Sequence, residues 1–114
     1  MDKVQLKYET NNNTLIVELE GELDHHVAED IRIELDDIIE RKRIRNLIFD
    51  MGLLHFMDSS GIGVIMGRYK NISKLGGKVA VVEVPDKIDK IFTLAGLYRI
   101  VEKYQNKREA INRM

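Results

Sequence analysis

The sequence predicts an α/β fold in a single domain, residues 1–114, and two kinds of segment predict it. Residues 46–51 and 79–84 are almost continuously apolar, which is typical of strands buried inside a largely parallel sheet. Around them, apolar residues recur at three- and four-residue steps, the spacing of amphipathic helices. A chain of 114 residues is the size of one ordinary domain. We therefore expect a mixed, mostly parallel sheet of four to five strands with about four helices.

The chain begins with a predicted β-hairpin. Val4, Leu6 and Tyr8 alternate with polar residues, which is the pattern of a half-exposed strand. The three asparagines at positions 11–13 predict a tight turn, because asparagine tolerates a positive φ better than most residues. The second strand covers residues 14–20. We expect the first strand to lie at the edge of the sheet.

The first predicted helix follows residues 21–24, and Asp24 is a plausible N-cap for it. Acidic residues come early in this segment and the cations of residues 41–43 come late, which suits the helix dipole. Its apolar stripe has six members: Val27, Ala28, Ile31, Leu35, Ile38 and Ile39.

Three further helices follow in the predicted order of elements. One covers about residues 60–75 and is stopped by two glycines. Another begins after Pro85 and is ended by Gly96, and a short last strand near residues 99–101 follows it. The tail, residues 106–114, can form the fourth helix. The resulting order β-β-α-β-α-β-α-β-α allows right-handed crossovers between parallel strands, and it leaves open whether helices cover one sheet face or both.

The composition excludes several classes of function. Lys and Arg number 18 against 19 for Asp and Glu, so the net charge of -1 offers no excess to attract nucleic acid. The absence of cysteine excludes disulfides and thiolate chemistry and fits a reducing compartment. The amino terminus is charged from Asp2, and no apolar run reaches the length of an export or membrane segment. We therefore expect a cytoplasmic protein that binds neither membrane nor nucleic acid directly.

The histidines suggest catalytic or metal chemistry, but simpler explanations exist. His25 and His26 are adjacent, so their side chains point apart, and they lack the spacing of a metal-binding pair. His55, Asp58 and Ser59 crowd into one short segment without the strand-turn-helix context of a serine nucleophile. We therefore expect no metal site and no hydrolase.

Two further patterns also have ordinary structural explanations. The glycine pattern of residues 61–67 falls inside a helical segment, whereas a pyrophosphate-binding loop joins a strand to a helix. The cations of residues 41–45 are favourable at a helix C-terminus, and no aromatic platform for nucleic acid accompanies them. The sequence therefore predicts no enzyme and no cofactor.

The segment FMDSSGIG at the start of the second predicted helix is harder to explain by folding alone. One hydroxyl suffices as a cap, so Ser60 as N-cap leaves Ser59 without a structural task. The helix also contains Gly61, Gly63 and Gly67, each costing about 1 kcal/mol relative to alanine. Either these glycines pack against the protein's own sheet, or a partner lies flat against this end of the helix.

Two motifs together resemble the anti-sigma factor antagonists of the STAS domain family. They are GELDHH at residues 21–26 and FMDSSGIGVIMGRYK at residues 56–70. The order of predicted elements also agrees, so the resemblance covers nearly the whole chain. Departures are ordinary apolar exchanges, such as Ile62 and Met66. The resemblance implies a STAS fold without catalytic activity.

The resemblance also implies a partner-switching function in transcription regulation during sporulation. In antagonists of this kind, an anti-sigma factor that is also a serine kinase transfers phosphate from ATP to the first serine of the Asp-Ser-Ser-Gly motif, here Ser59. The unphosphorylated antagonist binds the kinase, with ADP or ATP in the kinase site, and the sigma factor is released. The phosphorylated antagonist does not bind until a serine phosphatase restores it.

The resemblance places the contact surface for the kinase around Ser59, which must then be exposed. Seven residues are implied as partner-binding: Asp24, Asp58, Ser60, Gly61, Ile62, Gly63 and Arg68. An alternative is a STAS module that senses a ligand such as a nucleotide, although no glycine-rich phosphate loop supports it.

Overall fold

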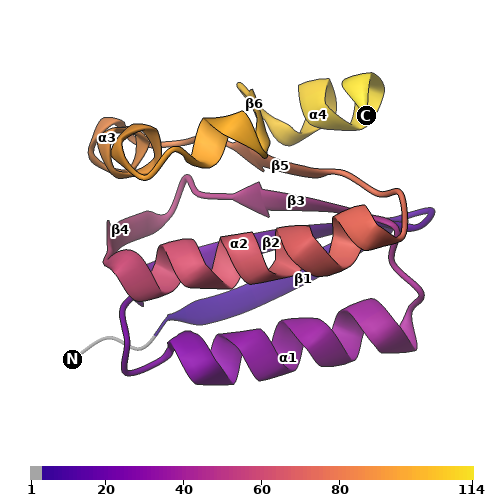
Figure 1. Ribbon diagram of the computed structural model, residues 1–114, viewed down its shortest axis with the longest axis horizontal. Coiled ribbons are helices and arrows are strands. Elements are labelled where there is room, and N and C mark those ends of the chain that lie inside the picture. The colour runs from indigo at the N-terminus through magenta and orange to yellow at the C-terminus, as the bar shows by residue number, and fades with distance from the viewer. Residues whose placement is uncertain (1–3) are drawn as a thin grey trace.

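A six-stranded sheet forms the centre of the computed structural model, which describes residues 4–114 (Figure 1). The predicted α/β class is confirmed. In chain order the elements are β1 (Gln5–Asn11), β2 (Thr14–Leu23), α1 (Ala28–Arg41), β3 (Asn46–Asp50), β4 (Leu54–Met57), α2 (Ser59–Lys74), β5 (Val79–Val82), α3 (Asp86–Leu94), a 3-10 turn η1 (Leu97–Arg99), β6 (Glu102–Tyr104) and α4 (Lys107–Arg113).

The sheet is mixed, with one antiparallel pair at its edge. The strand order is β1-β2-β3-β5-β6, and β1 is antiparallel to β2 while the other pairs are parallel. The long strand β2 pairs with β3 along Thr14–Glu18 and with β4 along Gly21–Leu23. Strand β4 therefore extends the sheet at the end where α2 begins.

Helices cover both faces of the sheet, which answers the question that the sequence left open. On one face, α1, α2 and α3 bury Leu15, Val17 and Phe49 in the larger core. On the other face, the short helix α4 packs Ala110 against a small cluster of strand residues, namely Ile16, Ile48, Ala80 and Val82. Because strand side chains alternate between faces, the continuously apolar strands supply both layers.

The predicted hairpin turn and the predicted C-terminal ends of the second and third helices are confirmed. Asn12 has a φ of 56° in the turn between β1 and β2, and β1 lies at the sheet edge. Gly76 adopts a φ of 80° after α2, and a Cβ on Gly77 would collide with the carbonyl oxygen of Arg45. Gly96 has a φ of 73° after α3, and the tail forms α4 as predicted. Glycine is thus required where the chain leaves α2.

Two strand predictions need correction. Strand β4 was not predicted, because it has four residues and only Leu54 and Met57 are buried. The last strand is β6, Glu102–Tyr104, and not residues 99–101, where the chain forms the turn η1 instead. The sheet therefore has six strands, one more than the predicted maximum.

Asp24 is not the N-cap of α1. That position is held by Val27, which makes no side-chain capping bond. Asp24 instead forms a turn ahead of the helix: its Oδ1 accepts from the His26 N–H at 2.9 Å, and its carbonyl oxygen accepts from the Ala28 N–H at 3.0 Å.

The sequence predicts no export or membrane segment. That prediction depends partly on Met1, Asp2 and Lys3, which lie outside the described residues. Between residues 4 and 114, no helix combines the length and the apolar character that a bilayer crossing needs.

Candidate functional site

Ser59 is the first residue of α2, and its side chain is exposed. The N-cap is Asp58, whose extended backbone lets its Oδ1 accept from the Ser60 N–H at 2.8 Å. The predicted capping role of Ser60 is therefore wrong, because an aspartate one residue before Ser59 already fills it. The sequence correctly separates Ser59 from the capping function.

Asp58 also joins the two sequence motifs. Its Oδ2 accepts from the backbone N–H of His25 at 3.1 Å, and its own N–H donates to the carbonyl oxygen of Leu23 at 3.3 Å. The parallel pairing of β2 with β4 places Leu23 opposite Met57. The structure thus brings residues 21–26 against the start of α2, in keeping with the family resemblance, which implies that Asp24 and Ser59 share one surface.

The Asp58 carboxyl is held in its ionised form. Partial burial would raise its pKa, but hydrogen bonds from the N–H groups of Ser60 and His25, from the His25 side chain and from the Gly61 N–H outweigh that effect. The pKa of Asp58 is therefore lower than its ordinary value, as expected for a carboxylate that accepts several backbone hydrogen bonds. A negative charge next to Ser59 is a fixed property of the site.

The histidines beside Asp58 lie on the surface. The side chains of His25 and His26 do not point apart as predicted: their ring centroids lie 4.0 Å apart with the planes tilted by 37°. The His26 Nδ1 lies 3.6 Å from Asp24 Oδ1. Within the described part of the chain, no three metal-ligating side chains gather at one point. The geometry of this corner is that of a surface turn.

The sequence left two explanations for the glycines of α2, which are packing within the chain and contact with a partner. A Cβ on Gly61 would lie 2.5 Å from Met57 Cγ, so this glycine is needed for packing within the chain. A Cβ on Gly63 or Gly67 would meet nothing within 4 Å. Gly63 is also exposed, so its lack of a side chain keeps the surface beside Ser59 flat and open.

Arg68 does not lie on this surface, contrary to the expectation from the resemblance. It is only 4% exposed, and its Nε lies 2.9 Å from Oδ1 of Asp36 in α1. Burial lowers the pKa of the Arg68 guanidinium, and the charge of Asp36 opposes this shift. The side chain therefore connects α2 to α1 and is not available to a partner without moving.

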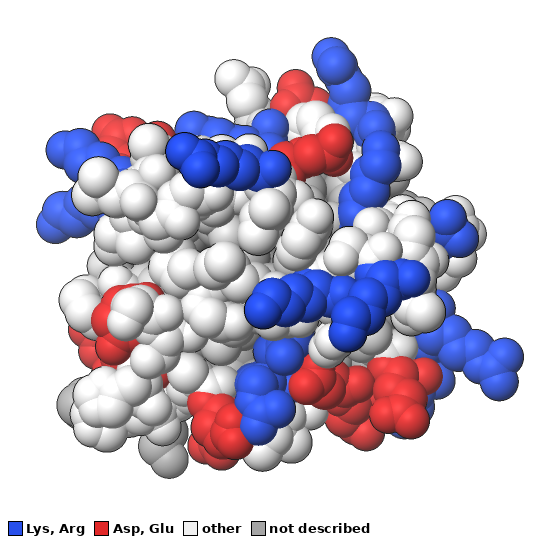
Figure 2. Space-filling view, in the orientation of Figure 1, with Lys and Arg blue, Asp and Glu red and all other residues white. Residues whose placement is uncertain are grey.

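A shallow hollow of about 440 Å³ with mostly apolar walls lies beside Ser59, which is one of its lining residues. Its walls come from the end of β4, the start of α2 and the C-terminal end of α3: Met57, Asp58, Ser59, Ile62, Ile91, Leu94 and Ala95. Leu94 is 87% exposed. Figure 2 shows uncharged side chains over the side of the molecule where α2 begins next to α3. The contribution of α3 was not predicted, and the available signal in the sequence was Leu94, an apolar residue off the core-facing stripe of this helix.

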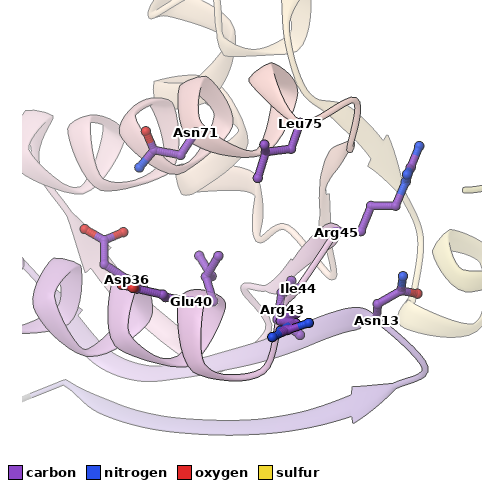
Figure 3. Close-up of a pocket in the computed structure, with 9 residues that line it drawn as sticks. Asn13, Asp36, Glu40, Arg43, Ile44, Arg45, Asn71 and Leu75 are labelled. Carbon is purple, nitrogen blue, oxygen red and sulfur yellow. The ribbon is translucent and has the colours of Figure 1, made fainter.

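A second hollow, of about 600 Å³, lies at the opposite end of α2 (Figure 3). Residues from α1, the end of α2, the loop before β3 and the turn between β1 and β2 line it: Asn13, Asp36, Ile39, Glu40, Arg43, Ile44, Arg45, Asn71 and Leu75. None of the predicted site residues contributes to it.

Comparison with known proteins gives consistent relatives. The STAS domain model matches residues 5–110. The anti-sigma F factor antagonist of Paenibacillus polymyxa is 38% identical over 111 residues, which are 97% of this chain and 95% of that protein. The anti-sigma-B factor antagonist of Bacillus subtilis is 27% identical over 100 residues, covering 87% of this chain and 89% of the relative.

Solved structures of the anti-sigma factor antagonist SpoIIAA have the same fold. Its unphosphorylated form matches with a TM-score of 0.75 and 29% identity, over 97% of this chain and 96% of that one. The phosphorylated form of Bacillus SpoIIAA matches with a TM-score of 0.74 and 31% identity, over 97% and 98%. With the motifs at Asp24 and Ser59 folded together as described, the chain belongs to the STAS domain family.

Proposed function

We propose that the protein is an anti-sigma factor antagonist that acts in the cytoplasm by partner switching. Its unphosphorylated form binds an anti-sigma factor serine kinase carrying ADP or ATP, and a sporulation sigma factor is released. The kinase phosphorylates Ser59, binding ends, and a serine phosphatase restores the active form. The observation that carries the proposal is the exposed Ser59 at the first position of α2, on the rim of an apolar hollow.

The position of Ser59 suits a phosphate acceptor. Phosphoryl transfer requires the hydroxyl to approach the γ-phosphate in line, with the base and Mg²⁺ supplied by the kinase. An exposed serine at a helix start satisfies this requirement without any rearrangement of the chain. The neighbouring hydroxyl of Ser60 is half-buried in the same turn, so Ser59 is the more accessible acceptor.

The same geometry explains why a phosphate would end binding. Phosphorylation adds about −1.5 to −2 charge at neutral pH, taking the net charge from -1 to roughly −2.5 to −3. The new charge would lie beside the ionised Asp58 and at the edge of the hollow that includes Ile62 and Leu94. A partner that covers the hollow would have to desolvate this charge, which is unfavourable unless it supplies cations.

The fold itself is expected to tolerate the phosphate. Negative charge is favourable at a helix N-terminus, by about 0.3–1 kcal/mol for an exposed group. Asp58 already uses the Ser60 N–H, so the phosphate adds charge at this end without being needed as a cap. We therefore propose that the switch acts at the partner surface and not through unfolding.

The test uses the full chain with its cognate kinase and three serine variants. Ser59→Ala should bind the kinase as wild type does and should accept no phosphate, whereas Ser59→Asp should bind at least tenfold more weakly. Ser60→Ala is the matched control and should still be phosphorylated. Binding is measured by calorimetry with ADP present, and the phosphate is located by peptide mapping. A phosphate found on Ser60, or full binding by Ser59→Asp, would contradict the proposal.

A second candidate function is ligand sensing, which the hollow between the C-terminal ends of α1 and α2 favours. Its volume of about 600 Å³ lies within the range of small-molecule sites, and Arg43 and Arg45 line it (Figure 3). Titration of the protein alone with ATP and GTP tests this candidate. Shifts confined to amides around Arg43 would support it, and no shift at saturating nucleotide would leave the antagonist as the better assignment.

A further inference from the structure

The free edge of β1 carries an alternation of charge that is complementary to itself. Strand β1 forms the end of the sheet and pairs with β2 on one side through seven consecutive residue pairs without a bulge. Its residues are exposed, apart from the half-buried Leu6. Lys7 and Glu9 point to the same face of the sheet, because they lie two residues apart. Edge strands usually carry charges that prevent pairing, but opposite charges at i and i+2 can also favour it.

Only one antiparallel register of β1 with a second copy brings opposite charges together. A two-fold axis at Lys7 would place the two Lys7 side chains opposite each other, and an axis at Glu9 would do the same with the glutamates. An axis at Tyr8 places Lys7 opposite Glu9 of the second copy, and does so twice. This register also uses the whole strand, because Gln5 then faces Asn11 and Leu6 faces Thr10.

Glu9 already takes part in an ion pair beside this edge. The Lys107 Nζ lies 2.8 Å from its Oε1, on the face of the sheet that α4 covers. The ion pair raises the pKa of the Lys107 ammonium. A Lys7 ammonium from a second copy would complete a row of alternating charges along the edge.

We propose that two copies of the chain associate edge to edge through β1, antiparallel and centred on Tyr8, to form one continuous sheet. Seven residues of strand span about 23 Å, so the contact is small and belongs to the weak class of interfaces. None of the β1 residues lines the hollow at Ser59, so both copies keep that surface free. The proposal is therefore independent of the proposed antagonist function.

The first experiment reverses the charges. Sedimentation equilibrium on the full chain, from micromolar to millimolar concentration, should show wild type approaching dimer mass. Lys7→Glu and Glu9→Lys should each weaken association at least tenfold, because they place like charges opposite each other. An equimolar mixture of the two variants should restore it, since the mixed pair is again complementary. Glu20→Lys, on β2 and away from the edge, is the matched control and should behave as wild type.

The second experiment fixes the register and does not depend on the charge variants folding normally. Because the chain has no cysteine, single-cysteine variants report only the introduced residue. Opposed residues of an antiparallel pair have Cβ atoms about 4.5–5.5 Å apart, close enough to form a disulfide after a small adjustment. Under mild oxidation Tyr8→Cys should form a covalent dimer, and Leu6→Cys and Thr10→Cys should cross-link only when mixed.

Ile33→Cys on the exposed side of α1 is the control and should remain monomeric. The proposal would be overturned if the mass stayed that of a monomer at every concentration and Tyr8→Cys cross-linked no faster than Ile33→Cys. Dimers that are unaffected by either charge reversal would also overturn it, because they would use another surface.

Discussion

Asp58 caps α2, which leaves the neighbouring Ser59 available for the phosphate-accepting role proposed for it. The carboxylate of Asp58 caps α2 and links it to His25, which fixes the start of the helix. The hydroxyl of Ser59 is thereby left exposed at the next position. A serine that served as the cap would have its oxygen engaged with a backbone N–H and would be a poorer acceptor of phosphate.

The charge of Asp58 should make stability depend on pH. A carboxyl whose pKa is lower in the folded protein stabilises the fold while ionised, above the unfolded value near 3.8. That contribution is lost as pH falls through the lower folded-state pKa. Asp58→Asn keeps an acceptor oxygen but no charge, so it should be less stable by about 0.3–1 kcal/mol near neutral pH. The difference should disappear in acid, as urea unfolding over a pH series would show.

Two of the three glycines of α2, Gly61 and Gly63, offer a matched pair of substitutions. Gly63→Ala should stabilise the protein by up to about 1 kcal/mol, because alanine favours helix and its Cβ meets no atom. Gly61→Ala should gain nothing or lose stability, since its Cβ would displace Met57. Thermal unfolding measures both effects. If Gly63 faces the kinase as proposed, a bulky residue there should weaken the complex while the fold remains stable. Equal destabilisation by both alanines would contradict this description of the helix.

At the scale of residues, the sequence was informative about local chemistry and uninformative about burial. Counting two hydroxyls against one cap left Ser59 without a structural task, although the cap is Asp58 and not Ser60, and the exposure of Ser59 was implied by the family resemblance. The burial of Arg68 did not follow, because its partner Asp36 lies on another helix and becomes a neighbour only when α1 and α2 pack together.

Two elements, β4 and α3, contribute to the site in ways that the sequence pattern did not predict. Strand β4 carries Asp58 to the end of β2, yet its four residues are too few for periodicity to identify. Helix α3 was predicted between Pro85 and Gly96, and its residues Ile88 and Phe92 face the core. Its role in the hollow depends on Leu94, which lies off that stripe and is exposed. Element positions were thus predictable, whereas the surface that they share required the folded arrangement.

Leu94 provides the test of α3 as part of the partner surface. Leu94→Lys should leave thermal stability nearly unchanged, because the side chain is 87% exposed. It should weaken kinase binding about tenfold or more if the partner covers the hollow, since a charge would then be desolvated. Leu75→Lys is the control: this leucine is also exposed, 71%, but lies at the other end of α2. Equal binding by both variants would exclude α3 from the contact.

The whole molecule is a sheet covered on both faces, and this architecture limits what a phosphate can do. The core beneath α2 includes buried residues of β2, β3 and β5, whereas Ser59 is exposed, so a phosphate on Ser59 would lie outside this core. The chain also matches the unphosphorylated and phosphorylated forms of SpoIIAA equally well, with TM-scores of 0.75 and 0.74.

We therefore expect phosphorylation to change the surface and not the fold. Amide spectra of the Ser59-phosphorylated protein should show shifts confined to the start of α2, the turn at His25 and the end of α3. The free energy of unfolding should change by no more than about 1 kcal/mol, which is the contribution of an exposed charge at a helix terminus. Widespread shifts across β3 and β5 would show that the switch works through the core.

The hydrogen bond between Asp58 and the backbone of His25 joins positions 33 residues apart. Under the proposed function, in which Asp24 and Asp58 both belong to the kinase-binding surface, that surface is discontinuous in sequence, so no linear fragment would reproduce it. A synthetic peptide carrying FMDSSGIG, or a proteolytic remnant of the chain, would then neither sequester the kinase nor compete with the intact molecule. Only a chain that has completed its β2 to β4 pairing would take part in signalling, which makes correct folding a precondition for activity.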